Sequence, residues 1–247
     1  MSSRISAGIA VLLLGSGLAA AQTPPVSSAR AQLDEVRRLA SVLDYPSAMT
    51  LFESVQAKTP DAIESLDGLK IQIVYLETGH TDKFLNLERW MIARYKSPKV
   101  STDAERSVKG YLIWKGATDP TILGHALEMT RFARERAVAS GEGEYQGFFD
   151  TAYGIALYRL GRYAEAAKWL PGQLGHQDVL VRTLALGFTA MNEFKLGNRA
   201  RSHELMTRAR KDQSNLPKLG SPTIGADWTD VLITKMVMAE AEGLIQP

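Results

Sequence analysis

Residues 153–166 decide the fold, and they read Tyr-Gly-Ile-Ala-Leu-Tyr-Arg-Leu-Gly-Arg-Tyr-Ala-Glu-Ala. Ala152, Ile155, Ala156 and Leu160 recur three or four positions apart, which is the spacing of one face of an α-helix. Gly161 follows this run and readily takes the left-handed conformation that ends a helix and reverses the chain. A second helical segment begins directly after it. The stretch therefore predicts a helical hairpin.

The same helical spacing of apolar residues continues along the chain from Arg30 onward. No segment alternates apolar and polar residues over six or more positions between turn signals, so we expect no β-strands. Three breaks, Asp44-Tyr45-Pro46, Thr59-Pro60 and Thr118-Asp119-Pro120, place a capping side chain before a proline in a first helical turn. The predicted fold class is all-α.

The predicted turns between helices recur at a nearly fixed interval. They fall near Leu43 and at Gly79, Gly116, Gly161 and Gly197, which are 36, 37, 45 and 36 residues apart. The longest interval contains a polar, glycine-rich insert at 139–144. A period in the mid-thirties, with a turn joining two helices of about a dozen residues, is typical of stacked helical hairpins, each covering the apolar flank of the one before.

The hairpin at 147–170 resembles a tetratricopeptide repeat (TPR). In that family a small residue lies midway along the first helix, a glycine follows its end, an aromatic residue comes two positions later, and a small residue opens the second helix. Gly154, Gly161, Tyr163 and Ala166 match these four positions. The resemblance implies a right-handed α-solenoid and a protein-binding function.

The remaining hairpins resemble the family less closely, and the resemblance covers about 30–214. The hairpin at 183–211 keeps Ala190, Gly197 and Ala209 but has Arg199 in place of the aromatic residue and Ser202 in place of alanine. The first hairpin lacks the turn glycine, the one around Gly79 has Phe84 where alanine is usual, and the one around Gly116 matches mainly in length. The segment 120–245 also resembles repeat arrays of planctomycete-type bacterial proteins, through its Tyr-Arg-Leu-Gly-Arg-Tyr run and its Trp228…Glu240-Ala241-Glu242 ending.

The last predicted helix covers about 226–244 and follows a loop at 212–225 that contains two prolines and two glycines. Trp228, Val231, Leu232, Met236 and Ala239 fall on one side of it. A helical array needs a terminal cap with one polar face, so we expect this helix to cap the C-terminal end of the array.

The first 21 residues have the pattern of a signal peptide. Arg4 supplies a positive charge, an apolar run follows at 7–18, and Ala19-Ala20-Ala21 forms a cleavage site. The alternative is that the segment is retained as an anchor. We expect cleavage, a linker at 22–29, no transmembrane segment in the mature chain, and export to a bacterial periplasm.

Composition narrows the class of protein. The chain has 247 residues, 45% of them hydrophobic, no Cys, and a formal net charge of +2. Such a chain is not disordered over most of its length, and its charge argues against binding to nucleic acid. The lack of Cys excludes disulfides, thiolate metal sites and a cysteine nucleophile. We expect one helical repeat domain over 30–245.

No catalytic motif is present, and we expect no catalytic residues, no cofactor and no metal. The four histidines, His80, His125, His176 and His203, lack the close spacing of metal ligands and are expected to be solvated. No G-x-S-x-G or phosphate-binding glycine loop occurs. The alternative is an envelope enzyme or enzyme subunit with its site in the 140–150 or 212–225 loop.

If the hairpins stack, the first helix of each lines a concave groove that binds a protein or peptide partner. An apolar floor with a basic rim would suit a peptide with apolar anchors and acidic groups. The alternative is that Ile155, Met191 and Phe194 are interhelical core. Some family members bind the acidic tails of heat-shock chaperones through polar residues. We do not expect this partner here, because Ile155 and Met191 occupy positions where polar residues would be needed. The predicted groove residues are Thr151, Ile155, Tyr158, Arg159, Met191, Phe194 and Lys195.

Charge is spread unevenly along the chain. Residues 31–88 hold ten acidic and five basic side chains, whereas residues 150–218 hold six acidic and eleven basic ones. This gradient could steer anionic partners or favour head-to-tail self-association, although a solvated surface is the usual explanation. The sequence therefore favours an exported, non-enzymatic interaction scaffold and leaves an enzyme and a self-assembling structural protein open.

Overall fold

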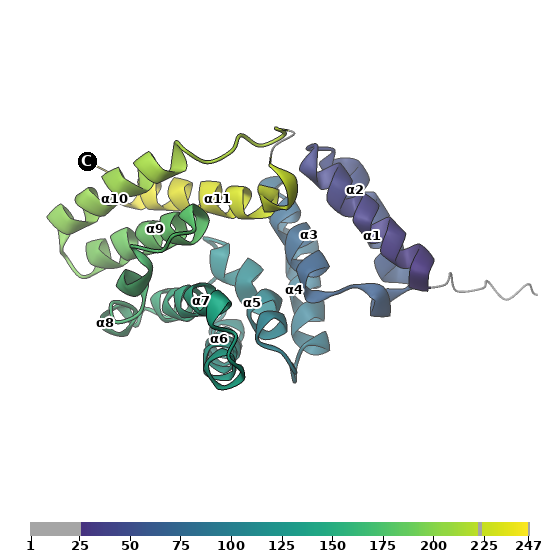
Figure 1. The fold of residues 1–247 in the computed structure, drawn as a ribbon, viewed down its shortest axis with the longest axis horizontal. Helices are drawn as coiled ribbons and strands as arrows, with labels where there is room; N and C mark the ends of the chain where they lie inside the picture. Colours follow the sequence, from purple (N-terminus) through teal and green to yellow (C-terminus); the bar gives the residue numbers. More distant parts are fainter. Residues whose placement is uncertain (1–25, 222–223, 247) are drawn as a thin grey trace, which may run out of the picture.

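The computed structural model describes residues 26–221 and 224–246, and all regular structure in these residues is helical (Figure 1). This confirms the predicted fold class. The predicted signal peptide at 1–21 lies outside the described residues. The first helix begins at Val26, so the last four residues of the predicted linker are helical, and Ala29 is buried.

Eleven α-helices and four short 3-10 helices occupy the described residues. The α-helices are α1 (Val26–Ser41), α2 (Tyr45–Lys58), α3 (Ser65–Glu77), α4 (Thr81–Arg94), α5 (Ser101–Ile113), α6 (Pro120–Ser140), α7 (Gln146–Arg159), α8 (Tyr163–Ala166), α9 (Val179–Lys195), α10 (Arg199–Gln213) and α11 (Trp228–Leu244). The 3-10 helices are η1 (Pro60–Ala62), η2 (Gly143–Tyr145), η3 (Leu170–Gln173) and η4 (Gly225–Asp227).

Most of the predicted turns reverse the chain through a residue with a positive φ angle. Gly79, Gly161 and Gly197 have φ angles of 75°, 72° and 85°, and Leu43 takes the same left-handed region at 66°. Gly116 does not. Its lack of a side chain instead admits the indole of Trp114, because a Cβ on Gly116 would clash with that ring.

Two of the three predicted proline-associated caps form. The side chain of Asp119 accepts a hydrogen bond from the backbone N–H of Thr121 (2.8 Å) at the start of α6, and Asp44 caps α2 in the same way. Thr59 instead precedes the short helix η1, and its side chain makes no capping bond.

The hairpin that most resembles the repeat family has a second helix shorter than expected. Helix α8 spans only Tyr163–Ala166, and turns and η3 continue the chain from there. Pro171 lacks a backbone N–H, and its ring would clash with the carbonyl of the residue four positions before it, so an α-helix cannot continue through it. Helix α7 lies very close to this segment, since a Cβ on Gly154 would come within 2.7 Å of Leu170 Cδ2.

The odd-numbered helices α1, α3, α5, α7 and α9 contact one another in succession, and each also contacts the even-numbered helix that follows it. They end at Ser41, Glu77, Ile113, Arg159 and Lys195, so the ends are 36, 36, 46 and 36 residues apart. Helical hairpins therefore follow one another along the described chain, and the first helix of each contacts the first helix of the next.

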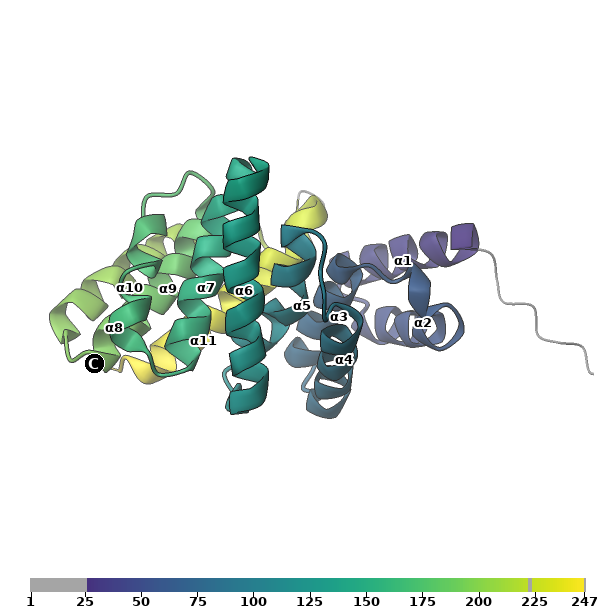
Figure 2. The same ribbon diagram turned by 90° about the horizontal axis from the view of Figure 1, so that it is seen from below.

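Helix α11 does more than cap the C-terminal end, which corrects the sequence prediction. It contacts α9 and α10 but also α3 and α5, so it runs back along the array towards its N-terminal half (Figures 1 and 2). Gly187 of α9 permits the approach, because a Cβ there would lie 3.0 Å from Val237 Cγ1. Ile233 and Met238 are buried, whereas Ala239, predicted for the apolar side, is exposed.

Candidate functional site

Four of the seven predicted groove residues are buried in the folded chain. Thr151, Ile155, Tyr158 and Met191 are at most 6% exposed. Ile155 and Met191 therefore lie in the interhelical core, which was the alternative to a groove position. A partner could reach these four side chains only if neighbouring helices moved.

The other three predicted groove residues differ from one another in exposure. Lys195 is exposed, and Phe194 is half-buried beneath the guanidinium of Arg199, which lies 5.0 Å from the ring centroid. The Arg159 side chain is only 6% exposed. The structure therefore leaves Phe194 and Lys195 as the accessible part of the predicted groove.

Arg159 joins three helices. Its guanidinium forms two hydrogen bonds with the Glu240 carboxylate of α11, at 2.6 and 2.7 Å. It also donates to the backbone carbonyls of Leu112 (2.8 Å) and Ile113 (3.3 Å) at the C-terminal end of α5, where carbonyls have no partner within the helix. Arg159, predicted to line a groove, thus anchors α11 to α5 and α7.

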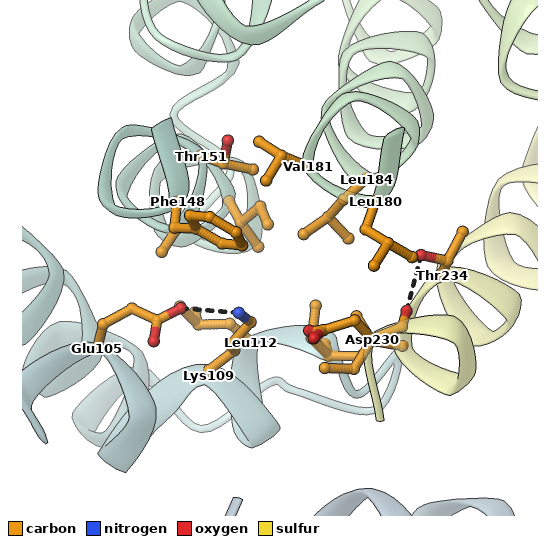
Figure 3. A pocket seen from close by; sticks show the side chains of 14 residues that line it. Glu105, Lys109, Leu112, Phe148, Thr151, Leu180, Val181, Leu184, Asp230 and Thr234 are labelled. Carbon is orange, nitrogen blue, oxygen red and sulfur yellow. Dashed lines mark hydrogen bonds and ion pairs between the residues drawn. The ribbon is translucent and has the colours of Figure 1, made fainter. Parts of the chain in front are cut away.

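Two adjoining cavities lie beside α11 and are the candidate functional site. The inner cavity, of about 20 Å³, is lined from α5, α7, α9 and α11, and its wall is mainly apolar, with Leu180 and Leu184 on one side. Figure 3 shows Phe148 on one side of this space and Lys109 and Asp230 facing each other on the other. The cavity holds little more than one water molecule.

The outer cavity is larger, about 180 Å³, and shares Glu105, Lys109, Phe148 and Asp230 with the inner one. Its apolar wall comes from α3 and from the start of α7, and Arg106 of α5 adds a second basic side chain. The apolar and aromatic residues that line it are Leu66, Leu69, Tyr145, Phe148 and Phe149. A concave apolar wall with a few charged groups is the usual composition of a ligand site.

Glu105 and Lys109 form a buried ion pair within the cluster. They are one turn apart on α5, and Lys109 Nζ lies 3.0 Å from Glu105 Oε1 and 5.6 Å from the centroid of the Phe148 ring. Burial by itself lowers the pKa of Lys109, but the carboxylates of Glu105 and Asp230 outweigh it and hold the pKa above its usual value. Lys109 therefore stays charged at neutral pH.

Asp230 and Arg106 line the outer cavity without a direct partner. No hydrogen bond or ion pair to either side chain occurs among the described residues; at longer range, Lys109 and Lys70 attract the Asp230 carboxylate, and Glu105 and Asp227 repel it. Burial raises the pKa of the Asp230 carboxyl above its usual value, because the charged form loses hydration.

The sequence analysis missed this cluster. The spacing of Glu105 and Lys109 is that of a solvated i, i+4 pair on a helix, and Asp230 lies more than a hundred residues further along the chain. The 140–150 region, predicted as an alternative enzyme site, supplies three aromatic side chains to the outer cavity. No described residue of the 212–225 loop lines either cavity.

The histidines occupy separate places in the fold. His80 and His203 are exposed, as predicted, whereas His125 and His176 are half-buried. Burial lowers the pKa of His125, and the backbone N–H of Asp178 donates to His176 Nδ1 at 3.1 Å. In residues 26–221 and 224–246, no three His, Asp or Glu side chains gather in a way that could hold a metal ion.

A second buried acid lies between α3 and α4, away from the cavities. Glu88 is fully buried, and Gln72 Nε2 donates to its Oε2 at 2.6 Å. Burial raises the pKa of Glu88 to about 8, and the bond from Gln72 offsets only part of this effect. Glu88 is therefore largely protonated at neutral pH and adds no negative charge to the core.

None of the described helices is both long enough and apolar enough to cross a lipid bilayer. Comparison with known protein families, curated proteins and solved structures finds no match to this chain.

Proposed function

We propose that the chain is an exported, non-enzymatic interaction scaffold, built as a right-handed TPR-like α-solenoid of five helical hairpins. The succession of contacts among α1, α3, α5, α7 and α9, and the recurrence of their ends, support the solenoid. The proposed partner is a protein or peptide of the bacterial cell envelope, to which the predicted signal peptide would direct the chain.

One observation carries the proposal: the inner surface holds a helix. Helices α3, α5 and α9 contact α11, and Arg159 of α7 forms an ion pair with Glu240 of α11. A surface that buries the apolar sides of a helix and pairs with its carboxylate has the chemistry of helix-in-groove recognition. In this chain α11 takes most of that surface, so the partner binds at the part that α11 leaves accessible.

That part is the junction of α9 and α10, where Phe194 supplies an apolar surface and Lys195 of α9 and Arg199 of α10 supply positive charge. We expect it to bind a segment with an apolar anchor and carboxylates.

Site-specific photocrosslinking tests this proposal. A photoreactive amino acid at Lys195 should give one discrete adduct in the cell envelope, and Phe194→Ala should abolish it. The matched control is the same amino acid at Val138, which is 71% exposed on α6 and should give no adduct. Failure to crosslink from Lys195, or an adduct unaffected by Phe194→Ala, would contradict the proposal.

A second candidate function, catalysis, rests on the acid–base cluster of Glu105, Lys109 and Asp230 in a pocket with an apolar wall. The purified mature chain would be incubated with peptidoglycan, glycan and ester substrates. Turnover that Asp230→Asn abolishes without loss of helical structure would favour an envelope enzyme over a scaffold.

A further inference from the structure

The outer cavity is distinct from the surface at Phe194 and Lys195, and its wall has charges of both signs. Glu105 and Lys109 neutralise each other at 3.0 Å. One carboxylate, Asp230, and one guanidinium, Arg106, remain, and neither has a hydrogen-bond or ion-pair partner in the described chain.

The charges around Asp230 do not remove its capacity to accept hydrogen bonds. Lys70 lies outside the cavity lining, and its ammonium is 5.8 Å from the centroid of the Trp228 ring. Lys109 faces Asp230 but pairs directly with Glu105 (Figure 3). The carboxylate of Asp230 is thus the acceptor that a donor inside the cavity would meet.

The apolar part of the wall limits the rest of the ligand. Leu66 and Leu69 come from α3, and Tyr145, Phe148 and Phe149 come from η2 and α7. The outer cavity has a volume of about 180 Å³, so only a small molecule fits.

We propose that this cavity binds a free α-amino acid with an apolar side chain. The ammonium pairs with Asp230, the carboxylate pairs with Arg106, and the side chain packs against Leu69 and Phe148. An internal residue of a peptide has neither charge, and a terminal residue has only one of them. The cavity therefore selects the free amino acid.

Isothermal titration calorimetry on the mature chain tests the ligand class with three compounds. Leucine has both charges, leucinamide keeps the ammonium and mimics a peptide N-terminus, and N-acetylleucine keeps the carboxylate and mimics a C-terminus. A hydrogen bond to a charged group changes affinity by about 10- to 150-fold, so leucine should bind at least about tenfold more tightly than either analogue. Equal or tighter binding of an analogue would overturn the proposal, as would no binding of leucine up to about 10 mM.

Two variants test the residues. Asp230→Asn and Arg106→Met should each weaken leucine binding at least about tenfold. The matched controls are Asp82→Asn and Arg136→Met, which change exposed residues outside the cavity lining and should leave affinity unchanged. Circular dichroism verifies that each variant is folded. Wild-type affinity in either folded cavity variant would refute the assignment.

Discussion

Replacing Arg159 by methionine tests whether this side chain holds α11 on the array. The substitution keeps the apolar stem and removes the guanidinium, which leaves the Glu240 carboxylate, itself only 15% exposed, without its partner. The carbonyls of Leu112 and Ile113 each lose a donor as well.

Removing one partner of a buried ion pair costs about 3–5 kcal/mol, because an unpaired charge stays buried. A cavity of about 340 Å³ lined by Ile113 and Glu240 lets water reach the exposed groups, which favours the lower end of this range. We expect Arg159→Met to lower the free energy of unfolding by about 3 kcal/mol. In a chain of this size that corresponds to a fall in Tm of about 6–12 °C.

Urea denaturation and thermal unfolding, both followed by the helical circular dichroism signal, measure these quantities. The control is Arg162→Met, because Arg162 pairs at 2.6 Å with Glu165 on the surface and both side chains are more than 40% exposed. This control should cost much less than Arg159→Met, because solvent screens an exposed pair.

A double variant separates the lost pair from the lost packing. Glu240→Leu in the Arg159→Met background removes the unpaired carboxylate and should restore at least about 1 kcal/mol of the free energy of unfolding. The reasoning would be refuted if Arg159→Met cost no more than Arg162→Met, or if the double variant lost the sum of the two single losses.

Three further predictions concern the core and a helix cap. The folded state keeps a proton on Glu88 that the unfolded chain releases above about pH 4.5, so the wild type should lose stability relative to Glu88→Gln by up to about 1.4 kcal/mol per pH unit until pH 8. Urea denaturation across this range measures the free energy of unfolding of both proteins. If the two plots of this free energy against pH ran parallel, the carboxyl would be ionised throughout, contrary to the prediction. Gly154→Ala should lower the free energy of unfolding by about 1–2 kcal/mol, because the added Cβ clashes with Leu170. Gly124→Ala has open space around it and should raise the free energy of unfolding by up to about 1 kcal/mol. A change of the same sign in both variants would contradict this packing. Asp119→Ala should cost about 1 kcal/mol and speed amide hydrogen exchange in the first turn of α6, and unchanged exchange there would exclude a capping role.

Local features of the fold could be predicted from the sequence because short-range interactions decide them. Gly79, Gly161 and Gly197 end helices through their own backbone freedom, and the prediction of a turn at each needs no knowledge of distant residues. Pro171 is likewise visible in the sequence, and it excludes an α-helix that continues through this position.

The position of α11 could not be predicted in the same way, because contacts with distant helices decide it. Its sequence nevertheless has a signal, since Lys235 is the one charged residue between Val231 and Ala239. A helix that is apolar on several sides is typically in contact with several others, so more than a terminal cap is expected of it.

The candidate site could not be predicted from the sequence for a related reason. Glu105 and Lys109 resemble any surface pair until α7 and α11 cover them, and Asp230 joins them only through the return of α11. Periodicity identifies the buried side of a helix but not the distant side chains that meet there.

The return of α11 also constrains how the chain can fold. A linear repeat array can fold unit by unit while the ribosome is still adding residues, because each unit needs only its neighbours. Here α3 and α5 are complete long before α11 is synthesised, and their inner surfaces stay uncovered during that time. Loss of α11 would therefore uncover α3 and α5 as well as α9 and α10, and the packing of all four helices waits until α11 has been made.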